Sequence, residues 1–265
     1  MQISDIIAYL ESVAPLSLQE HYDNAGLLVG HARTEVTGAL VCMDSTPEVV
    51  AEAKTQGCNL IIAHHPIIFR GLKRLNGSDY VQRAVMAAIK EDIAIYAIHT
   101  NLDNVLRRGV NGRIAKRLGL QDMRVLSARE SDEVDDETGA GVVGRLQQPL
   151  DESAFLAHLK TSMALQVIRH TPLLGRQVRT VAVCGGAGSF LLQDAIRAGA
   201  DVYVSADFKY HELFDADGKI VITDIGHFES ERFTVDLIID LLREKFPKFA
   251  ARSTEVNTNP VTYYH

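Results

Sequence analysis

The sequence Leu-Ile-Ile-Ala-His-His-Pro at residues 60–66 places two adjacent histidines directly after four apolar residues. A short apolar run of this kind is typical of a buried strand. Apolar residues then recur at helical spacing through residues 79–90, and a second apolar run occupies residues 93–98. Strands that alternate with helices in this way predict an α/β fold built around a largely buried sheet.

The same alternation continues outward over most of the chain. Gly57 and Gly119 stand where two of the helices should end. The predicted strands are 38–43, 60–63, 93–98, 142–146, 166–169, 180–184, 202–205 and 220–223. The predicted helices are 47–56, 79–90, 111–118, 151–163, 190–198 and 233–245. Six of the eight residues 130–137 are acidic, which predicts a solvated loop or hinge between two rounds of the pattern.

Composition narrows the function classes. The chain has 265 residues, of which 46% are hydrophobic and 23% charged, as in a globular protein of one or two domains. Its 27 Lys and Arg against 34 Asp and Glu give a net charge of −7, which disfavours a general nucleic-acid or anionic-membrane binder.

The sequence also carries information on the cellular location to be expected. The odd number of cysteines (Cys42, Cys58 and Cys184) gives no disulfide framework or CxxC metal motif. The chain shows no signal-peptide start and no apolar run near the ~18 residues that a membrane-spanning helix needs. We therefore expect a soluble cytoplasmic protein with no membrane partner.

Imidazole and carboxylate groups gather where predicted strands end. His64 and His65 follow one strand, residues 99–103 (His-Thr-Asn-Leu-Asp) follow the next, and residues 224–231 (Asp-Ile-Gly-His-Phe-Glu-Ser-Glu) follow a third. Open α/β sheets form their ligand sites at such strand ends. A single buried histidine is more often structural than a ligand, but convergence from three strands favours a metal site, because buried polar groups are costly unless paired.

The residue types point to a transition metal. Imidazole together with carboxylate suits Zn, Mn, Fe or Co. Because adjacent side chains on an extended backbone point in opposite directions, His64 and His65 are expected to bind two separate ions. His227 and Glu231 lie four residues apart, hence on one face of a helix, and a carboxylate there can bridge two cations. Two ions ~3.5–4 Å apart would hold a bridging water with a lowered pKa.

Two further clusters leave their roles open. Residues 185–189 (Gly-Gly-Ala-Gly-Ser) precede a predicted helix, where their amides either cradle an anion or simply make a tight turn. They lack the spacing of dinucleotide-binding and P-loop motifs. Asp207, Lys209, Tyr210 and His211 follow the strand 202–205 and serve either proton transfer and phosphate contact or structural ion pairing.

Taken in order, six motifs resemble those of the dinuclear-metal-centre, Nif3-like family, whose members are named GTP cyclohydrolase 1 type 2 homologs. The resemblance extends over nearly the whole chain. The motifs are residues 21–30 (His-Tyr-Asp-Asn-Ala-Gly-Leu-Leu-Val-Gly), 64–66, 99–103, 183–186 (Val-Cys-Gly-Gly), 206–211 (Ala-Asp-Phe-Lys-Tyr-His) and 226–231. The chain departs from the family pattern at His21 and Ala206, and neither departure removes a ligand.

The resemblance implies two divalent ions per subunit, of Zn, Mn or Fe. The family ligands fall on His64, His65, Asp103, His227 and Glu231, with Glu231 as the bridge.

It also implies two α/β domains, of which the first is discontinuous and contains both termini. We expect this first, metal-binding domain at residues 1–127 plus 220–265 and the second at 128–219. The length leaves no room for the inserted mid-chain domain of longer relatives, so this is the short form. The implied assembly is a toroidal homohexamer.

Two functions from different classes follow. The first is a metal-dependent hydrolase with a metal-bridging water and with His99 or Asp207 as base or acid. Its small-molecule substrate would be a nucleotide if the family name holds, because a GTP cyclohydrolase opens the guanine imidazole ring, and the same ions would also suit phosphoester hydrolysis. The second is a non-catalytic hexameric platform with a regulatory or metal-handling role. Nucleic-acid binding is disfavoured by the net charge.

Overall fold

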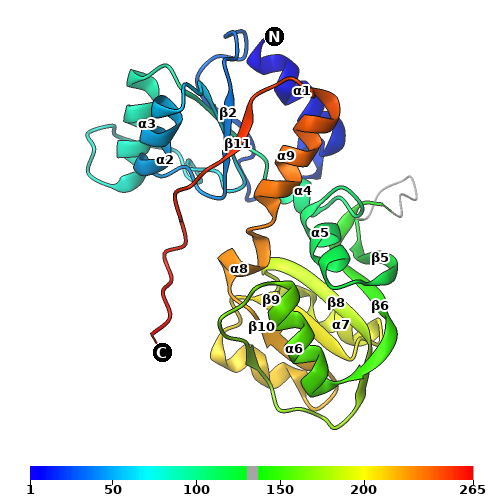
Figure 1. Ribbon diagram of the computed structural model, residues 1–265. Coiled ribbons are helices and arrows are strands. Elements are labelled where there is room, and N and C mark those ends of the chain that lie inside the picture. The colour runs from blue at the N-terminus through cyan, green and yellow to red at the C-terminus, as the bar shows by residue number, and fades with distance from the viewer. Residues whose placement is uncertain (130–136, 265) are drawn as a thin grey trace. The chain divides into compact units, whose positions relative to one another are not determined.

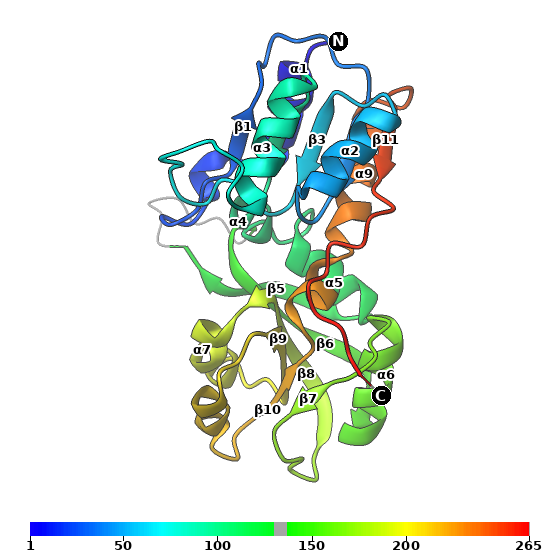
Figure 2. The same ribbon diagram turned by 90° about the vertical axis from the view of Figure 1, so that its left-hand side faces the viewer.

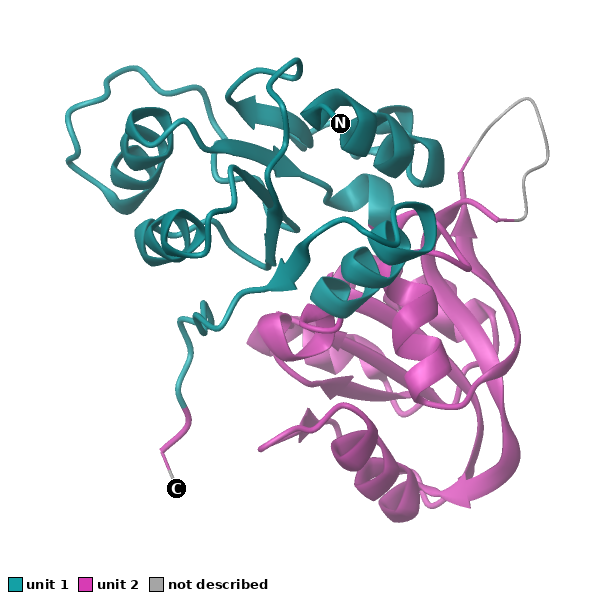
Figure 3. Cartoon of the chain, turned by 45° about the horizontal axis from the view of Figure 1, so that its top comes forward, with its two compact units in different colours: residues 1–102, 234–262 teal, residues 103–233, 263–265 magenta. Residues whose placement is uncertain are grey.

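The computed structural model describes residues 1–129 and 137–264, and its chain folds as two compact units (Figure 3). Unit 1 comprises Met1–Leu102 and Thr234–Thr262, and unit 2 comprises Asp103–Phe233 and Tyr263–His265. Each unit contains one sheet flanked by helices. The prediction of a two-domain α/β fold, with the first domain interrupted by the second, is confirmed.

The limits of the units differ from the expected boundaries at 127/128 and 219/220. Strand β5 (Gln121–Ala128) pairs antiparallel with β6 (Gly139–Asp151), so the acidic run, whose residues 130–136 lie outside the described residues, connects two strands of one sheet. Strand β10 (Val221–Asp224) pairs with β9 (Val202–Ala206) in that same sheet. Backbone pairing therefore keeps both segments in unit 2, whatever the shift in composition suggests.

Unit 1 is built on a five-stranded sheet in the order β1-β4-β3-β2-β11, parallel except for β1. The strands are β1 (Gly26–Val29), β2 (Ala39–Cys42), β3 (Leu60–Ala63), β4 (Ala94–Ala97) and β11 (Ala251–Ser253). Figure 1 shows α2 and α3 on one side of this sheet and α1 and α9 on the other. The helices are α1 (Ile3–Val13), η1 (Leu16–Leu18), α2 (Pro47–Thr55), α3 (Tyr80–Lys90), α4 (Thr100–Asp103, whose last residue belongs to unit 2) and α9 (Thr234–Lys245).

The central strands of unit 1 end level with one another. Cys42 of β2 is aligned with Ala63 of β3, which is aligned with Ala97 of β4. All residues of these strands are buried, as expected for a parallel sheet covered on both faces. The residues that follow the three strands therefore emerge at one edge of the sheet.

Local sequence signals fix where the covering helices start. Thr46 caps α2 by accepting a hydrogen bond from the Val49 amide at 3.4 Å, and Pro47 occupies the first helical position. Asp79 caps α3 by accepting from the Gln82 amide at 2.8 Å. The apolar faces of both helices pack on the buried residues of the sheet.

Unit 2 contains a six-stranded mixed sheet in the order β5-β6-β8-β9-β10-β7. Its helices cover both faces, with α6 and α7 on opposite sides (Figure 2). The strands besides β5, β6, β9 and β10 are β7 (Arg169–His170) and β8 (Gln177–Ala187). The helices are α5 (Val110–Arg117), α6 (Glu152–Ser162), η2 (Ser189–Leu191), α7 (Leu192–Arg197), η3 (Tyr210–Ala216) and α8 (His227–Glu231).

Some predicted elements are shorter or divided. The predicted strand 166–169 is reduced to the two-residue β7, and the predicted helix 190–198 starts as the 3-10 turn η2 before α7. Strands β1 and β5 have no counterpart in the sequence prediction, because they are short or partly exposed edge strands without a continuous apolar run. Within the described residues, no helix combines the length and apolar character that crossing a membrane requires.

A substitution at Gly112 in helix α5 tests whether close packing outweighs the intrinsic helix propensity of the residue. Ala is favoured over Gly inside a helix by about 1 kcal/mol. At this position, however, an added Cβ would lie 1.9 Å from the Leu106 carbonyl oxygen. We expect Gly112→Ala to lower the free energy of unfolding by about 1–3 kcal/mol, the usual cost of overpacking, as measured by urea denaturation.

The matched control is Gly71→Ala, because a Cβ at Gly71 meets nothing within 4 Å. This substitution should change stability by less than about 0.5 kcal/mol. A Gly112→Ala protein as stable as the parent would show that the Leu106 carbonyl can move away freely, contrary to the close packing described.

Candidate metal centre

Three histidines meet at the strand edge of unit 1. His64 and His65 follow β3, and His99 follows β4. Their ring centroids are 4.9 Å (His64 to His65), 5.3 Å (His64 to His99) and 5.4 Å (His65 to His99) apart. One ring nitrogen from each lies within 4.8 Å of the others, a spacing at which they could hold a metal ion.

The two adjacent histidines do not project to opposite sides of a strand. β3 ends at Ala63, and the backbone bends at His64 and His65. The alternation expected of an extended chain therefore stops one residue before the pair. This bend lets both imidazoles converge, whereas strand geometry predicted that they would point in opposite directions.

Hydrogen bonds fix the protonation of each ring. His64 Nδ1 lies 3.0 Å from the Ile98 carbonyl oxygen, and His65 Nδ1 lies 2.8 Å from Asp44 Oδ1. His99 Nδ1 lies 2.8 Å from Asp23 Oδ1. A carbonyl or an ionised carboxylate only accepts, so each Nδ1 is a donor, and in the neutral ring each Nε2 is the nitrogen with the lone pair. Metal-binding histidines are held by outer partners in this way.

Asp23 is a partner of His99 that the sequence analysis did not assign. Its side chain is fully buried, and besides His99 it accepts hydrogen bonds from the Thr100 hydroxyl (2.5 Å), the Thr100 amide (3.1 Å) and the Asn24 amide (2.6 Å). Burial raises the pKa of Asp23, but the hydrogen bond and charge of His99, with the bonds from Thr100 and Asn24, outweigh it and lower the pKa to about 2.

Asp44 plays the same part for His65. Burial raises the pKa of Asp44, and the hydrogen bond and charge of His65, with the Thr258 hydroxyl donating at 2.8 Å, lower it on balance. The signals for both carboxylates were present in the sequence, since Asp44 follows a predicted strand and Asp23 lies in the motif 21–30. Neither signal says which histidine the carboxylate will contact.

Unit 2 carries the second set of candidate ligands on the short helix α8. His227 Nε2 lies 3.1 Å from Glu231 Oε2, one helical turn away. His227 Nδ1 lies 2.7 Å from Asp207 Oδ2, so Asp207 orients His227 as Asp23 orients His99. Asp207 adopts a left-handed backbone conformation with φ of 57°, which is uncommon for a residue other than glycine.

Gly185 and Gly186 leave room for the Glu231 side chain. Their amides are already hydrogen-bonded within the protein, so these two amides do not form an anion site. A Cβ on Gly186 would lie 2.4 Å from Glu231 Oε1, and Gly186 has φ of +62°. The Gly186 amide donates to Ser230 Oγ at 2.9 Å, and the Gly185 amide donates to Asn111 Oδ1 at 2.8 Å. Both amides are thus already used, and the glycines serve the close approach of the carboxylate.

Asp103 adds a second carboxylate in unit 2. One of its oxygens lies within 4.8 Å of a Glu231 oxygen. Nearby, burial raises the pKa of the Cys184 thiol, and the charges of Asp103 and Glu231 raise it further. Two carboxylates so close together concentrate negative charge, which a divalent cation would offset.

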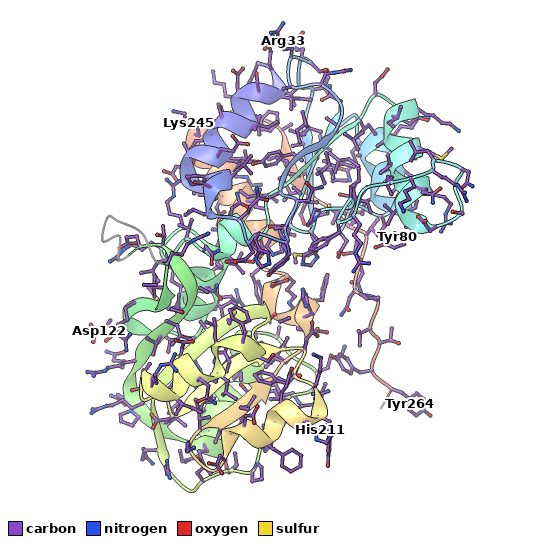
Figure 4. All side chains as sticks on the ribbon, turned by 180° about the vertical axis from the view of Figure 1, so that it is seen from behind. Arg33, Tyr80, Asp122, His211, Lys245 and Tyr264 are labelled. Carbon is purple, nitrogen blue, oxygen red and sulfur yellow. The ribbon has the colours of Figure 1, made fainter. Side chains whose placement is uncertain are left out.

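The other polar residues after β9 do not join this cluster. Lys209 pairs with Glu212 at 3.5 Å, and His211 packs its ring 5.2 Å from that of Tyr210. His211 is exposed and lies at the surface of unit 2 (Figure 4). Of the residues predicted after this strand, only Asp207 contacts a candidate ligand.

Comparison with known proteins agrees with this architecture. A model of the family described as Duf34/NIF3 (NGG1p interacting factor 3) matches residues 1–260. A "GTP cyclohydrolase 1 type 2 homolog" of Lactococcus lactis is 34% identical, with 98% of each chain covered. A protein of the same name from Clostridium perfringens is 34% identical over 87% of each chain. The crystal structure of a Bacillus cereus protein related to NIF3 superposes with a TM-score of 0.90 at 26% identity, covering 100% of this chain and 99% of the other.

The role of Asp44 as the outer partner of His65 can be tested directly. Asp44→Asn removes the charge that holds the Nδ1 proton of His65. We expect metal affinity to weaken about 10- to 100-fold, as measured by competition with a chromophoric chelator, because outer partners of metal-binding histidines usually matter to that extent.

Asp92→Asn is the control, because Asp92 is exposed in the same unit and its φ of 51° suits Asn. Its metal affinity should match that of the parent protein. Equal affinities in all three proteins would mean that Asp44 has no part in metal binding.

Proposed function

The chain belongs to the Duf34/NIF3 family, and from this membership we propose that it is a hydrolase dependent on two divalent ions of Zn, Mn or Fe. The observation that carries the proposal is the shared orientation of His64 and His65, each with Nδ1 hydrogen-bonded to an oxygen acceptor. Such an arrangement is typical of histidines that give Nε2 to a metal.

The donor set fits the proposed ions. The ligands would be the set that the family resemblance implies, namely His64, His65, Asp103, His227 and Glu231, and Glu231 would be shared between the ions. Imidazole nitrogens and carboxylate oxygens suit Zn, Mn and Fe. Five side chains leave coordination positions of two ions for water or substrate, as catalytic sites require. Bound divalent ions would lower the pKa of water towards neutrality and polarise the bond to be broken.

The side chains around these ligands would hold and move protons. Asp23 stays ionised beside His99, so it stabilises the imidazolium that forms when His99 Nε2 accepts a proton. We assign His99 as the group that takes a proton from the attacking water and returns it to the leaving nitrogen. Asp207 acts through His227, whose Nδ1 proton it holds, and is a positioning residue.

The names of the relatives suggest the reaction. A GTP cyclohydrolase adds water at the carbon between the two imidazole nitrogens of guanine, breaks one C–N bond and releases that carbon as formate with a second water. His99 would serve each hydrolytic step by the same proton transfer.

Substituting Glu231 tests the metal assignment. Glu231→Gln keeps the volume of the side chain but removes the charge proposed to be shared by two ions. We expect metal content, measured by elemental analysis of depleted and reloaded protein, to fall from about two ions per chain to one or none.

Glu229→Gln is the matched control on the same helix, because the Glu229 carboxylate interacts with Tyr263 and is no proposed ligand. It should retain two ions. If Glu231→Gln also retains two ions, the assignment of Glu231 as the shared ligand is wrong.

Substituting His99 separates proton transfer from metal binding. His99→Ala should retain its metal and lose formate release from GTP by about 10²- to 10⁴-fold, the usual contribution of a positioned acid or base. A parallel loss of metal would make His99 a ligand. Two tightly bound ions without formate release in the parent protein would exclude GTP ring opening and favour another hydrolytic substrate or a non-catalytic platform.

A further inference from the structure

The chain concentrates positive charge directly after His64-His65-Pro66. Residues 67–79, which we call the cationic loop, carry Arg70, Lys73 and Arg74 and no acid before Asp79. All three cations are exposed, and none forms an ion pair with any residue in the ranges 1–129 and 137–264. In a protein with a net charge of −7, three unpaired cations within five residues form a local site of the opposite sign.

The first half of the loop is anchored on unit 1. Ile67, Ile68 and Leu72 pack against the buried residues of the sheet and its helices. The Ile68 carbonyl accepts a hydrogen bond from Asn24 Nδ2 at 2.6 Å. Arg70 and Lys73 are thereby carried on backbone that apolar burial and a hydrogen bond hold in place.

Gln82 of helix α3 anchors the second half. Its side chain is buried, and Gln82 Nε2 donates to Ser78 Oγ at 2.8 Å and to Asp79 Oδ2 at 2.7 Å. Gln82 Oε1 accepts from the Asn76 amide at 2.9 Å. Both ends of the amide are satisfied by the loop, so the turn before Tyr80, labelled in Figure 4, is fixed before any ligand arrives.

The loop and Gln82 line an open pocket with a volume of about 550 Å³, which is within the range of small-molecule sites. Lys73 and Arg74 supply its charge, while Asn76, Ser78 and Gln82 supply polar groups. Arg and Lys facing such a pocket without a carboxylate partner suit a phosphate, because charge-assisted hydrogen bonds to phosphate are among the strongest in proteins.

Two exposed aromatic rings lie beside the histidines. Tyr22 and Phe69 stack with centroids 6.4 Å apart and planes inclined by 28°, and their side chains are 54% and 46% exposed. The Phe69 ring is 6.1 Å from the His99 ring. Half-exposed rings of this kind offer a stacking surface for a planar heterocycle.

We propose that the cationic loop binds the phosphates of a nucleoside phosphate whose base stacks on Phe69 next to His99. The proposal rests on the proposed function for its link to turnover and names the substrate class of that site. Phe69 directly precedes Arg70, so the ring beside His99 and the first cation of the loop are carried by adjacent residues. A base stacked on Phe69 would lie next to His99, which favours attack on the ring over hydrolysis of a phosphoester.

Binding to the full-length protein tests the proposal without turnover. The probes are GTP, guanosine and inorganic tripolyphosphate, measured by equilibrium dialysis at low and high salt with metal content kept constant. For Lys73→Gln/Arg74→Gln we expect the Kd of GTP and of tripolyphosphate to rise about tenfold or more, and the Kd of guanosine to stay unchanged. The parent protein should bind GTP more weakly as salt increases.

Lys90→Gln/Lys245→Gln is the matched control, because it removes two exposed cations of unit 1 that lie outside the loop; Lys245 is labelled in Figure 4. Its Kd for GTP should change less than about twofold. Phe69→Leu should weaken guanosine binding and leave tripolyphosphate binding unchanged.

Each opposite result overturns the proposal. An unchanged Kd of GTP in Lys73→Gln/Arg74→Gln removes the phosphate contact, and equal affinity for tripolyphosphate and GTP removes the base contact. A single-stranded oligonucleotide that binds over tenfold more tightly than GTP would make the ligand a nucleic acid. Loss of metal or of formate release without these changes overturns only the proposed function.

Discussion

The hydrogen bond from histidine Nδ1 to an oxygen that can only accept is the interaction on which the candidate centre depends. It occurs at His64, His65 and His99, with a carbonyl or carboxylate as the acceptor each time. The bond holds the ring and directs Nε2 to its proposed task, which is metal binding in His64 and His65 and proton transfer in His99. It requires each ring to lie beside its acceptor, and the level ends of β2 and β3 achieve this for His65 by bringing it and Asp44 to one edge of the sheet.

Apolar runs followed by histidine are a local pattern, so the sequence predicted the α/β class and the strand-end clusters, whereas the two-domain organisation was implied by the family resemblance. The pairing of Asp23 with His99 joins residues 76 positions apart, and no local pattern encodes it. The bend at His64 and the approach of Glu231 to Gly186 likewise depend on packing. The limits of the two units differ from the predicted boundaries, because strand pairing decides which sheet a segment joins. The homohexamer and the cytoplasmic location stay predictions.

The buried carboxylate of Asp23 and the exposed cations of the cationic loop are held in place in different ways. Burying Asp23 is unfavourable by itself, and the hydrogen bonds of His99, Thr100 and Asn24 offset that cost. The cationic loop shows the complementary situation, in which charges stay exposed while the backbone beneath them is fixed by Gln82 and by apolar packing. A site that holds ions through preset histidines and a substrate through a preset loop needs little rearrangement on binding.

The most direct test is anomalous diffraction at the absorption edge of the metal, with crystals of protein loaded with Zn, Mn or Fe. The account predicts two peaks per chain, one of them about 2.0–2.2 Å from His64 Nε2, with the Nδ1 hydrogen bonds of the histidines intact. A single peak, or coordination through Nδ1 with Asp23 or Asp44 displaced from its histidine, would contradict it.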